Sequence, residues 1–144
     1  MPNDLNFLDA LSETLGVSLA FREDLTCCLS TPDGLEIQIE SAPEQDAIVF
    51  TAALGHVPAG DERLLRHLLA ANFLFQGTRG ESVALEESTD RAMLCRQFSP
   101  SRLSPAEGVE IFRQFADTAT RWRQHLAEVP ATTANSAAEA HLRA

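Results

Sequence analysis

Residues 64–75 of this chain read LLRHLLAANFLF, and this stretch decides how the rest of the sequence is interpreted. At about 100° per residue, its leucine, phenylalanine and alanine side chains surround nearly the whole of an α-helix. A surface helix of a monomer needs one apolar stripe, so this pattern predicts burial on more than one side. The helix either lies in the centre of the core or packs between its own sheet and a second copy of the chain. A chain of 144 residues has little material to cover both sides, which favours the dimer.

The charge of the chain is large and unevenly distributed. The net charge is −10, and residues 1–60 hold ten acidic side chains against one basic side chain, Arg22. Residues 61–144 hold eleven acidic side chains and ten arginines, and the chain contains no lysine. Such a field repels nucleic-acid phosphates, so we exclude nucleic acid as a partner and expect a basic or Ser/Arg-rich one.

Two features of the chain bear on its compartment. The N-terminal segment MPNDLNFLDALSE is acidic where a secretory signal is basic. The longest apolar runs are too short to cross a membrane. We therefore expect a cytoplasmic protein that does not contact the membrane.

The hydrophobic periodicity predicts an α+β domain with the order helix, three antiparallel strands, helix, two strands, helix. Strict alternation over residues 35–40 places Leu35, Ile37 and Ile39 inward, and short connections make the first three strands a meander. The expected strands are 25–30, 35–40, 47–54, 82–87 and 91–98, and the expected helices are 4–15, about 61 to the stop at Gly77, and Ser104 to Pro130.

Capping residues predict where these helices begin and end. Asn3 is expected to cap the first helix and Gly16 to stop it. Ser104, Pro105 and Glu107 have the spacing of a capping box. Pro130 is expected to end the last helix, so residues 1–130 form a single domain and residues 131–144 a disordered Ala/Thr/Ser-rich tail.

No spacing of polar residues indicates catalysis or a metal centre. Cys27, Cys28 and Cys95 show neither a CxxC pair nor a histidine at metal-ligand spacing, and reduced, partly buried thiols are expected. Asn72, inside the apolar surface of the second helix, is expected to be a hydrogen-bonded structural residue. We predict no catalytic residue, no metal and no cofactor; a small α+β enzyme or ligand-binding domain is the less favoured alternative.

Several features occur in a fixed order along residues 4–128. They are a leucine helix ending at Leu15-Gly16, the stretch IVFTAALG (48–55) running to Val57-Pro58, the segment LLAAN (68–72) with a Gly-rich turn after it, a strand pair around Leu85 and Leu94, and a last helix with Ala119 and Trp122-Arg123. This ordered set resembles the class I type III secretion chaperones of the Tir-chaperone (CesT) family. The tail after Pro130 lies outside the family pattern.

The resemblance implies a small acidic homodimer. It would bind the N-terminal region of a secreted effector in extended form before export, keep it soluble and hydrolyse no ATP. A contact with the secretion ATPase is a further implication. A regulatory protein of the same fold that sequesters a type III secretion regulator is the alternative, and the sequence does not separate the two.

The resemblance also implies two sets of site residues. The second helix and the following strand would form the dimer interface, in agreement with the independent interpretation of residues 64–75. The residues implied for this interface are Leu65, Leu69, Phe73, Val83 and Leu85. The first helix and neighbouring strands would form the effector groove, with the residues Leu5, Phe7, Leu8, Leu11, Phe21 and Leu29.

Overall fold

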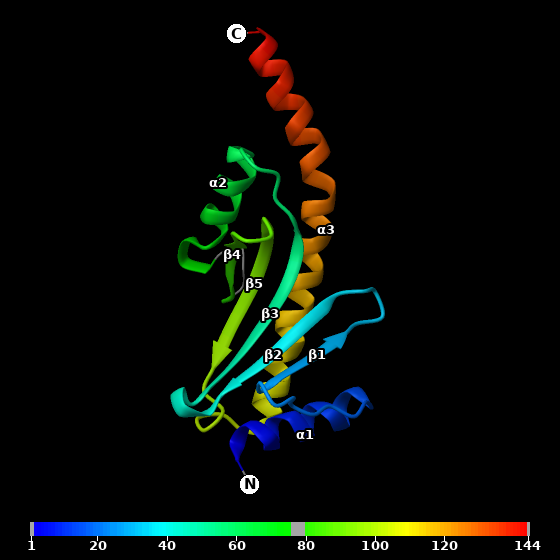
Figure 1. The fold of residues 1–144 in the computed structure, drawn as a ribbon, viewed down its shortest axis with the longest axis vertical. Coiled ribbons are helices and arrows are strands. Elements are labelled where there is room, and N and C mark those ends of the chain that lie inside the picture. The colour runs from blue at the N-terminus through cyan, green and yellow to red at the C-terminus, as the bar shows by residue number, and fades with distance from the viewer. Residues whose placement is uncertain (1, 76–79, 144) are drawn as a thin grey trace.

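The computed structural model describes residues 2–75 and 80–143, with side chains described for residues 2–74 and 80–128. The order of elements is the predicted one (Figure 1). The elements are α1 (Asn3–Leu15), β1 (Thr26–Ser30), β2 (Glu36–Ala42), β3 (Ala47–His56), α2 (Glu62–Ala71), β4 (Ser82–Glu86), β5 (Arg91–Phe98) and α3 (Pro105–Arg143), with short 3-10 turns at Pro43–Gln45 and Phe73–Phe75.

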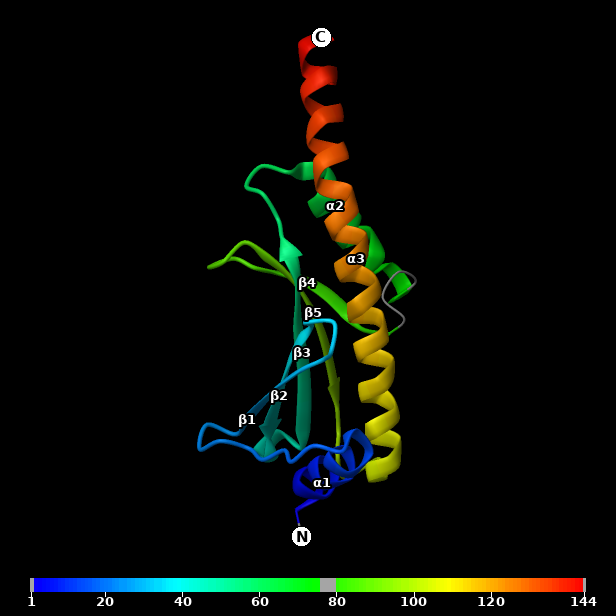
Figure 2. The ribbon, with the colours of Figure 1, turned by 90° about the vertical axis from the view of Figure 1, so that its right-hand side faces the viewer.

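The five strands form one antiparallel sheet in the order β1-β2-β3-β5-β4. The first three strands form the predicted meander, and β5 pairs with β3 so that β4 becomes an edge strand. The long helix α3 runs along one face of the sheet, and α1 packs at one end of that face (Figure 2). Among residues 2–75 and 80–143 no helix covers the opposite face, which we call the open face (Figure 2).

The core lies between the sheet and the two helices α1 and α3. Leu35, Ile37 and Ile39 are fully buried while the alternate residues of β2 are exposed, which confirms the predicted alternation. Phe50 of β3 is at the centre of an aromatic cluster, with ring centroids 5.4–5.8 Å from those of its neighbours. The neighbouring rings are Phe7, Phe98, Phe112 and Phe115.

The helix signals of the sequence are mostly confirmed. Gly16 ends α1 in the left-handed conformation (φ 70°), which glycine adopts without steric cost. The Glu107 N–H donates to Ser104 Oγ (3.1 Å) and the Ser104 N–H to Glu107 Oε1 (3.2 Å), a complete capping box. The prediction for Asn3 is wrong: Asn3 is the first helical residue, and Pro2 precedes it without a side-chain cap.

Two predicted helix ends are also wrong. The predicted stop Gly77 lies outside the described residues, but α2 already ends at Ala71, and Leu74 has a left-handed backbone (φ 52°) that a continuing helix excludes. At the other end of the chain, α3 continues through Pro130 to Arg143 and projects beyond the sheet (Figure 1). A helix can contain a proline when it gives up one main-chain hydrogen bond, so proline is not an absolute stop. The disorder of residues 131–144 in solution stays a prediction.

Candidate partner-binding surfaces

The C-terminal end of α2 and the 3-10 turn after it carry the most exposed large apolar side chains of the described chain. Leu64, Leu68 and Ala71 are buried against the sheet. On the opposite side, Leu69 is 72% exposed, Phe73 69% and Leu74 71%. We call these three residues the α2 surface. The helix is therefore apolar on two sides, and its own subunit covers one of them.

Asn72 fixes the α2 surface to the sheet. Its Nδ2 donates to the Val83 carbonyl at 2.8 Å, and its Oδ1 accepts from the Val83 N–H at 2.8 Å. The amide thus replaces a neighbouring strand at one position of the edge strand β4. This confirms the predicted role of Asn72 as a hydrogen-bonded structural residue. The same bonds explain why α2 stops here, because they hold the chain close to β4 before it turns at Leu74.

The five residues predicted for the dimer interface differ in exposure. Leu69 and Phe73 belong to the α2 surface, and Leu85 on β4 is 40% exposed. Leu65 is half-buried against the core, and the Val83 side chain is buried. Leu69, Phe73 and Leu85 therefore present side chains to solvent, whereas Val83 supports them through its bonds to Asn72. The interface itself stays a prediction.

The six residues predicted for the effector groove divide in the same way. Phe7, Leu8 and Leu11 lie in the core with exposures of 1%, 2% and 0%. A side chain at this depth contacts a partner only if the core opens. Leu5 is 40% exposed, and Phe21 and Leu29 are half-buried at the edge of the core. The groove stays a prediction and now depends on Leu5, Phe21 and Leu29.

Next to these residues, the edge strand β1 has backbone N–H and C=O groups that point away from β2. The Arg22 N–H donates to the Thr26 carbonyl at 2.8 Å, so the backbone groups of Thr26 point away from β2. Alternate residues of an antiparallel edge strand share this direction, which places the N–H and C=O groups of Cys28 and Ser30 outward as well. An extended peptide could pair with this edge.

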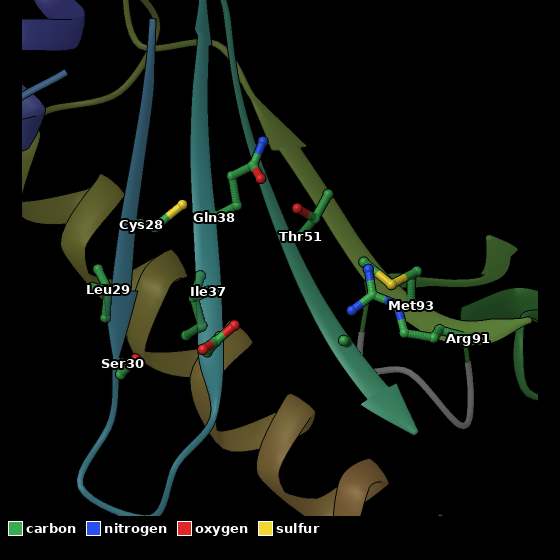
Figure 3. Close-up of a pocket in the computed structure, with 10 residues that line it drawn as sticks. Cys28, Leu29, Ser30, Ile37, Gln38, Thr51, Arg91 and Met93 are labelled. Carbon is green, nitrogen blue, oxygen red and sulfur yellow. The ribbon is translucent and has the colours of Figure 1, made fainter. Parts of the chain in front are cut away.

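The open face of the sheet contains a shallow hollow that sequence reasoning missed. Its volume is about 250 Å³, and Cys28, Gln38 and Thr51 lie in one cross-strand row along it (Figure 3). Met93 and Arg91 of β5 close one side, and Glu86 Oε1 holds the Arg91 guanidinium at 2.8 Å. The sequence does carry a signal for this hollow, because the residues at the alternate positions of these strands are small or polar. Only the strand order brings them into one row.

Comparison with known proteins identifies the family. The sequence profile of the Tir chaperone protein (CesT) family matches residues 6–123. The chain belongs to this family. No curated protein sequence matches it.

Several solved structures have the same fold. The ExsC–ExsE complex matches with a TM-score of 0.72 and 16% identity over 86% of this chain and 94% of the other. The HopA1–SchA chaperone–effector complex gives 0.67 and 17% over 85% and 91%. The heterodimeric ExoU–SpcU complex from the type III secretion system of Pseudomonas aeruginosa gives 0.65 and 21% over 83% and 93%. At these identities the likeness establishes the fold, and the match to the family profile establishes the family.

The polar groups of this chaperone act as structural ties. The Arg123 guanidinium reaches Asp33 Oδ2 at 2.9 Å and connects the β1–β2 hairpin to α3. Asp46 accepts from the hydroxyls of Ser99 and Ser101 and connects the β2–β3 turn to the segment before α3. Hydrogen bonds from Ser101 and Ser99 lower the pKa of Asp46. The Asp46 carboxylate is thereby kept ionised, which is the form that accepts these hydrogen bonds.

The three thiols differ in exposure, and Cys95 is half-buried. Cys27 is buried and Cys28 exposed, and all three cysteines are free. Burial raises the pKa of the Cys27 and Cys95 thiols, which keeps them protonated and unreactive. Within residues 2–74 and 80–128, no three His, Cys, Asp or Glu side chains gather where they could hold a metal ion. No helix in the described part of the chaperone is long and apolar enough to cross a membrane.

Proposed function

We propose that this chaperone is a cytoplasmic homodimer that binds an N-terminal segment of a type III secreted effector in extended form, without ATP hydrolysis. Membership of the CesT family supports the chaperone role. Related structures such as the HopA1–SchA chaperone–effector complex support an effector as the partner. The observation that carries the proposal is the α2 surface, which a chaperone acting alone would leave in water.

The α2 surface suits a second copy of the chain. Large apolar side chains gathered on one exposed patch mark interaction sites in soluble proteins. A two-fold axis through such a patch makes Leu69 and Phe73 of one subunit meet the same residues of the other. The charge distribution also favours a dimer interface in residues 61–144, because this half is close to neutral while residues 1–60 carry most of the negative charge. Two acidic subunits therefore approach through their least repulsive side.

The double substitution Leu69→Glu/Phe73→Glu tests the dimer. We expect a folded monomer, because both side chains are exposed and their replacement leaves the core intact. The mass in sedimentation equilibrium should fall by half while the far-ultraviolet circular dichroism stays unchanged. A matched control is Leu15→Glu/Val17→Glu, which changes two other exposed apolar residues and should leave the dimer in place. A folded dimer in the first variant would contradict the proposed interface.

We propose the β1 edge and the neighbouring apolar residues as the effector contact. The outward backbone groups of Cys28 and Ser30 provide strand pairing, and Leu5, Phe21 and Leu29 provide apolar contacts. Phe7, Leu8 and Leu11 support this surface from the core. A contact of this kind buries about 800 Å² or more on each partner when it is stable.

Leu5→Asp tests this contact, with Leu15→Asp as the matched control, because both leucines belong to α1 and are 40% exposed. Each variant is co-expressed with the effector encoded beside the chaperone gene, and the complex is measured by size exclusion. We expect Leu5→Asp to weaken the complex at least about tenfold, since a charge would face the apolar side chains of the effector, and Leu15→Asp to retain it. Equal binding by both variants would contradict the placement of the groove. Capture of a transcription regulator in place of an exported protein, or ATP turnover by the purified chaperone, would contradict the function.

A further inference from the structure

Two histidines from different helices meet on the surface between α2 and α3. The Nε2 atoms of His67 and His125 lie 3.0 Å apart, within hydrogen-bonding distance. The two rings have centroids 5.0 Å apart, and each contacts the indole of Trp122, at 5.6 Å for His67 and 5.8 Å for His125. Trp122 is buried and holds both imidazoles in place.

A hydrogen bond between two imidazoles depends on protonation in a defined way. When both rings are neutral, one N–H donates and the other nitrogen accepts. When one ring is protonated, its N–H still donates to the neutral ring, and the bond becomes charge-assisted. When both rings are protonated, both nitrogens are donors, so the bond is lost and two like charges face each other.

Charged side chains of both helices lie near the pair. Within one helical turn, α2 contributes Arg63 and Arg66, and Arg63, Arg66 and His67 line one surface hollow. On α3, Arg121 precedes His125 by four residues and Glu128 follows it by three. Arg66 is paired with Glu62 at 3.7 Å and Arg121 with Asp117 at 3.2 Å. The nearby charges therefore largely balance, and the repulsion at low pH comes from the two protonated imidazoles themselves.

We propose that His67 and His125 form a proton-operated latch that holds α2 against α3 while at least one imidazole is neutral and releases it when both are protonated. The latch acts on the helix that carries the α2 surface. Asn72 fixes the C-terminal end of α2 to β4, and the histidine pair fixes its middle to α3. Release of the pair leaves the first turns of α2 held by the buried Leu64 and Leu68. The consequence for the second subunit depends on the proposed function, whereas the latch itself does not.

Amide hydrogen exchange of the full chaperone tests the latch directly. Rates for residues 64–71 and for α1 are measured from pH 8 to pH 5 and corrected for intrinsic exchange. We expect protection of residues 64–71 to fall about fivefold towards pH 5, the equivalent of one lost hydrogen bond, while α1 stays protected. An equal loss in both helices, or no loss in α2, would overturn the proposal.

Two substitutions at His125 separate the latch from general acid destabilisation. His125→Gln keeps a hydrogen-bonding group that does not ionise, so protection of α2 should become independent of pH. His125→Phe removes the bond, so α2 should exchange about fivefold faster at every pH, again without pH dependence. His56→Gln, at the end of β3, is the control and should behave as the parent protein. A parent-like pH dependence in His125→Gln would overturn the proposal even if His125→Phe does not fold. Sedimentation of the same samples shows separately whether the dimer persists.

Discussion

The helices α1 and α2 have similar sequences in one respect and opposite surroundings in the structure. Both carry more leucine and phenylalanine than a single packing face needs. In α1, Phe7, Leu8 and Leu11 are buried between the sheet and α3. In α2, Leu64 and Leu68 are buried, but Leu69 remains in solvent together with Phe73 and Leu74 beyond the end of the helix. The same kind of apolar pattern therefore forms core in one helix and an unpartnered surface in the other.

The difference follows from what lies opposite each helix. Gly108, in the first turn of α3, lets that helix approach α1 so closely that a Cβ there would lie 2.7 Å from Cδ1 of Phe7. This contact encloses the centre of the α1 stripe, Phe7, Leu8 and Leu11, while Leu5 and Leu15 towards its ends remain 40% exposed. The outer side of α2 has no corresponding element in the described part of the subunit, since α3 meets α2 at the His67–His125 pair. A wide apolar stripe thus indicates that something covers it, and only the packing of distant elements shows whether that is the same chain.

The largest expected effect comes from comparing the loss of one phenylalanine ring in α1 with the loss of one in the α2 surface. Phe7→Ala removes a ring that packs on Phe50 and Phe98, and we expect it to lower the free energy of unfolding by about 3–5 kcal/mol. Phe73→Ala, made in the Leu69→Glu background to remove any contribution of a second copy, should change it by less than about 0.5 kcal/mol. Urea denaturation measures both. If the two truncations cost the same, the α2 surface packs within its own subunit and the comparison fails.

An intermediate effect is expected where α2 is fixed to β4. Asn72→Ala removes two hydrogen bonds of 2.8 Å and leaves the Val83 N–H and C=O without their partner. We expect a loss of about 1–3 kcal/mol in the free energy of unfolding, with faster exchange of the Val83 amide. Gln38→Ala removes an exposed amide from the open face and serves as the control. An unchanged Val83 exchange rate in Asn72→Ala would show that another group holds the end of α2.

The smallest effect concerns the end of the molecule where α1 packs. Hydrogen bonds from Ser101 and Ser99 hold the pKa of Asp46 below its ordinary value of 3.8. A carboxylate with a lowered pKa stabilises the folded state above its unfolded pKa and loses this contribution as the pH falls through the folded value. Asp46→Asn should therefore reduce stability at pH 6 slightly and weaken the decline between pH 4 and pH 2. Urea midpoints at these pH values measure both effects. If Asp46→Asn lost as much stability between pH 4 and pH 2 as the parent protein, other carboxylates would cause the decline.

Much of the fold followed from local patterns. Alternation of apolar residues in β2, the capping box at Ser104 and Glu107, and the glycine stop of α1 are decided by neighbouring residues, so the sequence alone predicts them correctly. The early end of α2 was not predictable in this way, because it depends on bonds between Asn72 and a strand eleven residues further along the chain.

The candidate sites were predicted only in part for the same reason. The period of a helix shows which side chains share a face, and this was enough to single out Leu69 and Phe73. It does not show what covers that face, so Phe7, Leu8 and Leu11 could not be distinguished from surface residues until α3 was placed against them.

The sequence by itself determined the α+β order of elements, the acidic charge and the family, since each depends on residue types and their spacing. Tertiary structure alone decided which apolar side of each helix remains exposed, the cross-strand row on the open face and the meeting of His67 with His125, 58 residues apart. These features arise from contacts between residues distant in the chain, which no local period encodes.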